Sequence, residues 1–404
     1  MQIQPVLAAL RRHRLATLLI VLEIALACGV LCNACFLIAN RLQQTGLQSG
    51  VDERSLAELT LTGYDPAQAN DLNARVLDGL RTIQGVQSVS VINAVPFGNH
   101  AGTAGIKLSQ DAQDIAGVVD FYVGGPGSFE ALGLRVVSGR APQAADMRVV
   151  DDFLPKSAPV LVTRALAAHL WPGVDPLGQV IWCVGRPFRV MGVLDHLARP
   201  AGGEGGPETR EWSVFVPALP GPNLAGVYLL RAAPGQLDRV LRDARARIAK
   251  IAPEVVVDSQ GSQTVSELRD RYFRDDRAMA GMLLGVIVAL LLVTALGIVG
   301  LTSFWVAQRR KQIGVRRALG ATRGDILGYF QTENFLIVSF GIALGMVLAF
   351  GINLLLMTQY ELPRLPLLYL PIGALVLWGL GQLAVLAPAL RAAAVPPVVA
   401  TRSV

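Results

Sequence analysis

The stretch LATLLIVLEIALACGVLCNACFLIA, residues 15–39, is mainly apolar and carries one charged side chain, that of Glu23. At about 1.5 Å of rise per residue, a helix of this length crosses a hydrocarbon core of about 30 Å. A cleaved signal peptide would have an apolar core of roughly 7–15 residues, followed by small residues and a cleavage site. The stretch therefore predicts a retained transmembrane helix over residues 15–40.

Three of the four cysteines, Cys28, Cys32 and Cys35, lie in this helix at helical spacing. We interpret them as packing residues, because no histidine or acidic residue stands in register to complete a metal site. The fourth, Cys183, lies far along the chain, so no disulfide framework is predicted.

The composition divides the chain into a membrane part and a water-exposed part. The sequence is 52% hydrophobic and only 16% charged, whereas a soluble domain is about 25% charged. The apolar excess gathers at the N-terminus and in the last third. Further spans are predicted near residues 278–307, 333–357 and 369–390. Four spans place both termini on one side of the membrane.

Basic residues set the orientation of these spans. The short loop between the third and fourth spans holds only Arg364, whereas the loop after the second is strongly basic. Its cations are Arg309, Arg310, Lys311, Arg316, Arg317 and Arg323. By the positive-inside rule, both termini and the basic loop are cytoplasmic, and residues 41–275 lie in the periplasm of a bacterial inner-membrane protein. Topology explains the net charge of +6, so no nucleic-acid partner is expected.

The first residues, 1–14, combine a few apolar side chains with arginines. They predict a cytoplasmic interfacial segment lying on the lipid of the inner leaflet, with a disordered start as the alternative.

The water-exposed middle of the chain contains two β-α-β patterns. Alternating apolar residues predict strands, and apolar residues three and four apart predict helices. The first unit comprises residues 56–62, 65–79 and 86–94, and the second comprises residues 226–232, 236–249 and 253–258. We expect them to pair in a ferredoxin-like α+β sandwich, with a β-rich lobe inserted at about residues 97–222 and a mobile loop at 200–207. The fold class is thus a four-helix membrane protein with a large extracytoplasmic α+β domain.

Catalytic patterns are absent from the sequence. A nucleotide-binding P-loop needs a Gly-Lys pair, and no such pair occurs in the chain. The four histidines are scattered, without metal or nucleophile spacing. The chain is therefore not expected to be an enzyme or to hold a cofactor.

The stretch QRRKQIGVRRALGATRGDILGYFQTE, residues 308–333, follows the second span. Gly320 and Gly324 bracket a turn, and Thr322 is a candidate helix cap. An apolar side is formed by Ile313, Val315, Leu319 and Ile326. The pattern predicts a helix-turn-helix elbow over residues 308–332 that docks on a cytoplasmic partner. A basic loop that only sets topology is the alternative. The candidate docking residues are Arg309, Arg310, Lys311, Ile313, Arg316, Arg317, Leu319, Gly320, Arg323 and Asp325.

Residues 309–326, RRKQIGVRRALGATRGDI, resemble the permease domain of MacB/FtsX-type ABC transporters. Three stretches of the middle domain resemble the MacB-like periplasmic domain of the same family: FEALGLRVVSGR at 129–140, LAAHLWPGVDPLGQ at 166–179 and FRVMGV at 188–193. The resemblance divides the chain into a MacB-like periplasmic domain, 41–275, and an FtsX-like permease domain, 276–404. The C-terminal residues 388–404 depart from the usual pattern of the family.

The resemblance implies a mechanism and partners. Members of the family dimerise, with like or unlike permease chains, and each permease recruits an ABC ATPase that holds ATP and Mg²⁺. The elbow corresponds to the coupling helix, and ATP-driven closure moves the periplasmic domains, which is called mechanotransmission. Because the chain starts almost at its first span, a separate ATPase chain is expected. A periplasmic adaptor and an outer-membrane channel are candidate further partners.

Two acidic residues lie in or beside the spans, where charge is costly. For Glu333 we consider an interfacial ion pair with a nearby arginine, or a role in coupling elbow tilt to the third span. Glu23 could snorkel inward or pair across a dimer with an arginine of the basic loop.

Three functions fit the sequence. The first is a permease that extrudes a peptide, an antibiotic or a lipoprotein, and the two-lobed middle domain favours it. The second is an FtsX-like signal transducer that activates a periplasmic enzyme. The third, a membrane anchor for a binding domain, would not need the elbow.

Overall fold

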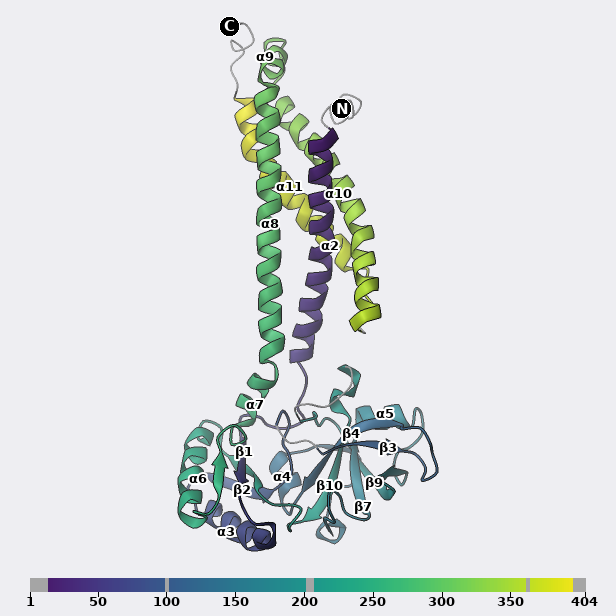
Figure 1. The fold of residues 1–404 in the computed structure, drawn as a ribbon, viewed down its shortest axis with the longest axis vertical. Coiled ribbons are helices and arrows are strands. Elements are labelled where there is room, and N and C mark those ends of the chain that lie inside the picture. Colours follow the sequence, from purple (N-terminus) through teal and green to yellow (C-terminus); the bar gives the residue numbers. More distant parts are fainter. Residues whose placement is uncertain (1–13, 99–101, 201–206, 361–363, 395–404) are drawn as a thin grey trace. The chain divides into compact units, whose positions relative to one another are not determined.

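A computed structural model describes residues 14–98, 102–200, 207–360 and 364–394. The chain divides into two compact units (Figure 1). We call residues 1–43 with 276–404 the membrane unit, and residues 44–275 the inserted unit, because the second interrupts the first. The expected interfacial segment except its last residue, most of the glycine-rich loop at 200–207 and the last ten residues lie outside the described ranges.

The membrane unit is built from long helices: α2 (Arg14–Thr45), α8 (Arg274–Gln308), α10 (Arg323–Tyr360) and α11 (Tyr369–Ala393), with the short helix α9 (Arg310–Ala318) between α8 and α10. Within the described residues, four helices are long and apolar enough to cross a membrane. The third begins ten residues before the expected position, because the second arm of the elbow and the expected span form one continuous helix.

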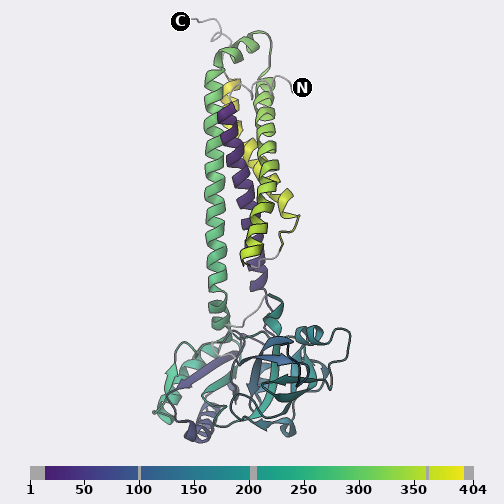
Figure 2. The same ribbon diagram turned by 45° about the vertical axis from the view of Figure 1, so that its right-hand side comes forward.

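Helix α2 runs alongside α10 (Figure 2). It packs closely against glycines of the neighbouring helices. A Cβ atom at Gly345 of α10 would stand 2.4 Å from the Cβ of Cys28, and one at Gly373 of α11 would stand 2.6 Å from the Sγ of Cys32. Small residues on both sides let the helix backbones approach, as is usual in membrane bundles. Cys28 and Cys32 are buried in this contact, which agrees with their interpretation as packing residues.

The inserted unit contains a sandwich lobe with a four-stranded antiparallel sheet in the order β12-β1-β11-β2. Its strands are β1 (Leu56–Thr62), β2 (Val86–Val91), β11 (Val227–Ala232) and β12 (Val256–Asp258), and its helices are α3 (Ala69–Arg81) and α6 (Leu237–Ile251). Numbered along the lobe, the order is 4-1-3-2, the ferredoxin-like arrangement predicted from the two β-α-β patterns. Helices α3 and α6 contact each other and the sheet.

Between β2 and β11 the chain forms a barrel lobe. Its strands are β3 (Thr103–Lys107), β4 (Gly117–Gly124), β7 (Ala158–Thr163), β8 (Val180–Cys183), β9 (Arg186–Leu194) and β10 (Ser213–Leu219). They follow the order β4-β3-β8-β9-β7-β10, and β10 then pairs in parallel with β4, so the sheet closes on itself. Two short strands, β5 (Val136–Gly139) and β6 (Arg148–Val149), extend it. Closure removes most exposed strand edges.

The two lobes are joined by hydrogen bonds where the chain crosses between them. The amide of Gly125 donates to the carbonyl of Val91 at 2.8 Å. Asn93 completes the junction, because its side chain donates to the Phe121 carbonyl and accepts from the amide of Val123, each at 2.7 Å. The lobes therefore share a continuous hydrogen-bonded seam rather than a free hinge.

The close approach of α2 and α10 gives a prediction for stability. We expect Gly345→Ala to destabilise the purified chain by about 1–3 kcal/mol, because the added methyl group overlaps Cys28. Gly351→Ala is the matched control on the same helix, since no described heavy atom lies within 4 Å of its Cβ position. The control should be neutral or stabilising by up to about 1 kcal/mol. Thermal unfolding in detergent measures both, and equal shifts would contradict the packing described.

Candidate functional site

The candidate site is the elbow between α8 and α10. Helix α8 ends at Gln308, and α9 begins at Arg310, with Arg309 at the break (φ −95°, ψ 8°). Ile313 and Gly314 of α9 are buried. Ile326 and Phe330, on the first turns of α10, belong to the same apolar cluster as Ile313, so one side of the elbow is packed.

The turn of the elbow is fixed by capping at both ends. Gly320 adopts φ +98°, the amide of Ala321 donates to the carbonyl of Arg316 at 3.0 Å, and the amide of Gly320 donates to that of Arg317 at 3.2 Å. This is the Schellman pattern, which favours glycine at that place. On the other side, the amide of Thr322 donates to the carboxylate of Asp325 at 2.9 Å, and the amide of Asp325 donates to the hydroxyl of Thr322 at 3.1 Å. This reciprocal capping box starts α10.

An ion pair joins the break before α9 to α10. Nη1 of Arg309 lies 2.9 Å from Oε2 and 3.2 Å from Oε1 of Glu333. The side chains are 15% and 2% exposed, and the guanidinium also lies 5.6 Å from the ring of Trp305. Of the two interpretations of Glu333, the structure contains the ion pair. Removing one partner of such a buried pair strands the other charge and typically costs about 3–5 kcal/mol.

Arg316 and Arg317 also hold the elbow together. The guanidinium carbon of Arg316 lies 5.0 Å from the ring centroid of Tyr329, a cation–π contact. Nη1 of Arg317 donates to the carbonyl of Ala393 at 3.1 Å, near the end of α11. These two arginines therefore connect α9 to α10 and α11, a role that the sequence analysis did not foresee.

The outward side of the elbow is partly apolar. Leu319 is 83% exposed and Val315 is 44% exposed, whereas Ile313 and Ile326 of the same predicted apolar side point inward. Lys311, Val315 and Leu319 are four residues apart, so they lie along one stripe. With the exposed cations Arg310 and Arg323 they form what we call the elbow face: Arg310, Lys311, Val315, Leu319 and Arg323.

The sequence analysis missed the aromatic partners of this site. Trp305 precedes Arg309 by four residues, and Tyr329 precedes Glu333 by four. Residues four apart share a helix face, so each aromatic ring lies on the same face as the charged residue that follows it. That spacing was a sequence signal for the aromatic contacts of the elbow.

Glu23, by contrast, is not part of the elbow. It faces α8, where a Cβ atom on Gly297 would come within 2.7 Å of its Oε2.

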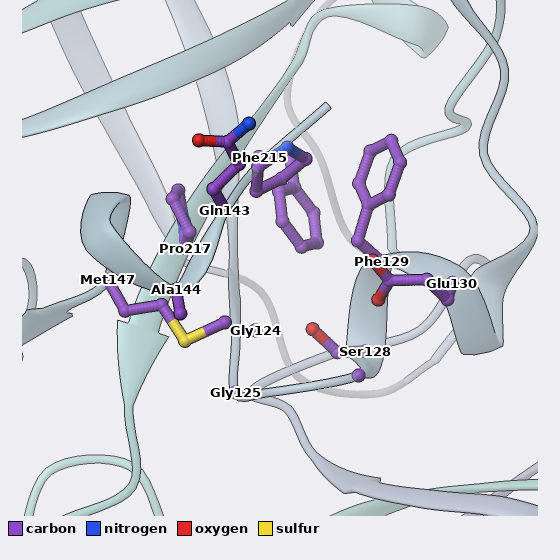
Figure 3. A pocket seen from close by; sticks show the side chains of 12 residues that line it. Gly124, Gly125, Ser128, Phe129, Glu130, Gln143, Ala144, Met147, Phe215 and Pro217 are labelled. Carbon is purple, nitrogen blue, oxygen red and sulfur yellow. The ribbon is translucent and has the colours of Figure 1, made fainter. Parts of the chain in front are cut away.

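The inserted unit carries a small pocket beside α4 (Ser128–Leu132), shown in Figure 3. Its volume is about 90 Å³, and the rings of Phe129 and Phe215 and the side chains of Met147 and Gln143 line it. The loop around it is held by Arg140, whose hydrogen bonds to Asp146 at 2.5 and 2.7 Å keep the pKa of that carboxyl below its usual value. Pockets for drug-sized ligands measure roughly 300–1,000 Å³, so this one is too small for such a ligand.

Helices able to span a membrane, a capped elbow and a two-lobed insertion define a membrane protein with a large extracellular domain. Two family models match the chain. The MacB-like periplasmic core domain matches residues 20–270, and the FtsX-like permease C-terminal domain matches residues 284–397. The chain therefore belongs to the MacB-like family of ABC transporter permeases. Neither matching domain is an ATPase domain.

Two of the matched relatives are distant in sequence. The chain is 25% identical over 367 residues to the macrolide export ATP-binding/permease protein MacB of Agrobacterium fabrum, covering 86% of this chain and 52% of that protein. It is 22% identical over 281 residues to the uncharacterized ABC transporter permease YknZ of Bacillus subtilis, covering 68% of this chain and 64% of that one. The chain thus spans less than two thirds of either relative.

Among solved structures, the extracellular domain of the noncanonic ABC-type transporter YknZ from Gram-positive bacteria covers 50% of this chain and 100% of its own length. The identity is 16% and the TM-score is 0.33, so the family assignment rests on the sequence matches.

The ion pair of the elbow gives a second prediction. We expect Arg309→Met to lower the free energy of unfolding by about 3–5 kcal/mol, because Glu333 is left buried without its cation. The double variant Arg309→Met with Glu333→Met should lower the free energy of unfolding much less, because neither charge of the pair remains buried without the other. Arg323→Met, on the exposed face, is the control. Thermal unfolding of the parent, Arg309→Met, Glu333→Met and the double variant forms a double-mutant cycle, and additive losses from the two single variants would contradict the pairing.

Proposed function

We propose that this chain is the permease subunit of a mechanotransmitting ABC transporter of the bacterial inner membrane. ATP hydrolysis on a separate cytoplasmic ATPase would drive the elbow, and movement of the inserted unit on the other side would extrude the substrate. The observation that carries the proposal is the elbow, a rigid structure with an exposed, partly apolar face. The arginine-rich sequence around it supports a cytoplasmic position.

The construction of the elbow suits the transmission of force. Its turn is capped on both sides, its break is closed by the pair of Arg309 and Glu333, and α9 is bound to α11 through Arg317. A push on the elbow face would therefore be shared by α8, α10 and α11 instead of bending one loop.

The elbow face offers chemistry for a protein partner. An exposed leucine between cations would fill an apolar pocket rimmed by acidic side chains, and burying such a leucine contributes about 1.5–3 kcal/mol. We infer that an ABC ATPase supplies this pocket, and that ATP and Mg²⁺ are bound there rather than by this chain. A second permease chain, like or unlike, would complete the transporter.

The substrate is proposed from the relatives. MacB proteins are described as macrolide exporters, so an antibiotic-like amphiphile is the first candidate, followed by a peptide or a lipoprotein. The small pocket beside α4 is not the proposed substrate site, since its volume is too small. An adaptor and an outer-membrane channel would be further partners of such an export system.

The docking proposal predicts the effect of a single surface change. Leu319→Asp should reduce co-purification of the ATPase encoded beside this chain by about tenfold or more, because a charged group replaces the apolar contact. Val184→Asp is the matched control, an exposed apolar residue of the inserted unit, 78% exposed. Reversal of Arg316 and Arg317 would be a poorer test, since both contribute to the elbow itself.

Purification by a tag on this chain, with ATPase activity and thermal unfolding of each eluate, gives the readout. Unchanged capture by Leu319→Asp would contradict docking through the elbow face. Failure of the native chain to capture any ATPase would contradict the permease proposal as a whole.

A further inference from the structure

The inserted unit is connected to the membrane unit by two stretches of chain. One runs from the end of α2 to β1, at residues 44–55, and the other precedes α8, where helix α7 (Val265–Tyr272) leads into it. Chain connectivity requires that any displacement of α2 or α8 enters the inserted unit through these stretches. The residues that bind these two stretches to each other and to the lobes therefore determine how a displacement of α2 or α8 is passed to the inserted unit.

One side chain binds the two stretches together. Arg269, on α7, donates from Nη2 to the carbonyls of Thr45 and Leu47, each at 2.7 Å, and its Nη1 lies 2.5 Å from Oε1 of Glu53. These partners all belong to the first stretch, residues 44–55. Helix α7 is itself fixed by a capping box, in which Thr264 and Glu267 bind each other's amides. A guanidinium suits this position, because its planar fork can serve several acceptors at once.

The same guanidinium stacks on a strained aromatic residue. Its central carbon lies 5.1 Å from the ring centroid of Phe97 and 5.5 Å from that of Phe273. Phe97 is 1% exposed and adopts φ +63°, a conformation that costs a bulky residue about 1–3 kcal/mol. Phe97 lies after β2, where the chain leaves the sandwich lobe for the barrel lobe. Packing thus holds the strained Phe97, between the two lobes, against the guanidinium of Arg269.

The stretch after α2 is also fixed to the barrel lobe. The amide of Ala198 donates to the carbonyl of Ser49 at 3.0 Å, and a Cβ atom on Gly50 would stand 2.1 Å from the carbonyl oxygen of His196. The loop that carries Ala198 is anchored in turn, because Arg199 forms a buried ion pair with Asp120 of β4 at 2.7 Å. The stretch therefore lies against the barrel lobe while Arg269 holds it to α7.

A second tie lies in the membrane unit. Nη1 of Arg41, near the end of α2, lies 2.5 Å from Oδ1 of Asp276, near the start of α8. The ion pair of Arg41 and Asp276 thus joins α2 to α8 within the membrane unit. Arg269 joins the two connecting stretches a second time, within the inserted unit.

We propose that Arg269 is the residue that makes the two connections of the inserted unit move as one element, and that passes their displacement to both lobes through Ser49, Gly50 and Phe97. It is a positioning residue for transmission. The proposal rests on the proposed function, since transmission presupposes an ATPase acting on the membrane unit.

The test uses the full-length chain with the variant Arg269→Lys, which keeps the charge but loses the fork. Arg271→Lys is the matched control, because Arg271 lies on the same helix and donates to the carbonyl of Gln260. Spin labels at Gln48→Cys and Asp275→Cys, both exposed, report the distance between the two connections. The four native cysteines are replaced by alanine for this measurement.

We expect a narrow distance distribution for the parent and for Arg271→Lys, and a broad one for Arg269→Lys. In the complex with the ATPase, with a macrolide antibiotic as the probe, Arg269→Lys should retain ATPase capture and ATP hydrolysis but lose most of the macrolide extruded per ATP. An unchanged distribution would overturn the proposal. A broadened distribution with unchanged extrusion per ATP would also overturn it, because Arg269 would then be only a structural tie. If even the parent captures no ATPase, the proposed function fails, and this failure differs from the other two.

A second variant tests the contact with the barrel lobe. Gly50→Ala and Gly63→Ala both place alanine at a positive φ, +81° and +80°, so their backbone strain is matched. No described heavy atom lies within 4 Å of the Cβ position at Gly63, whereas Gly50 abuts His196. Extrusion per ATP should fall for Gly50→Ala and stay near the parent value for Gly63→Ala. Equal values for the two variants would contradict transmission through this contact.

Discussion

A domain inserted between two membrane helices must begin and end where both connections can be held, and the inserted unit is built around that constraint. The sheet order β12-β1-β11-β2 places the first and last strands of the sandwich lobe side by side. Arg269 then joins the stretch before β1 to the helix after β12, with hydrogen bonds to the carbonyls of Thr45 and Leu47. Without this proximity, α2 and α8 would act on separate points of the unit.

The barrel lobe is also an insertion, and its two connections must likewise lie close together. It is inserted between β2 and β11, which are neighbours in the sandwich sheet, so its entry and exit are also close. The seam at Val91, Asn93 and Gly125 binds the lobes through backbone and amide hydrogen bonds. Because β10 pairs with β4, the barrel is one closed sheet attached along this seam.

The elbow of the membrane unit combines rigidity with an exposed apolar contact. Glycine at Gly320, the capping box of Thr322 and Asp325, and the buried pair of Arg309 and Glu333 restrict its shape. The internal contacts of Arg316 and Arg317 leave Leu319, Val315 and other cations to face outward. Arg316 stacks on Tyr329 and Arg317 binds the end of α11, so these two cations stabilise the elbow itself. The exposed Leu319, by contrast, contributes a favourable free energy only when a partner covers it.

The sequence by itself determined the membrane helices, their number and the two β-α-β units, because hydropathy and the periods of helix and strand are local properties. Capping at Gly320 and Thr322 was predictable for the same reason. Only the tertiary structure decided that β4 and β10 close a barrel, that Arg317 binds the end of α11, and that Phe97 and Arg269 meet. These contacts join residues far apart in the chain, for example Phe97 and Arg269, so the choice of partner depends on the folding of everything between them. Neither composition nor spacing carries that information.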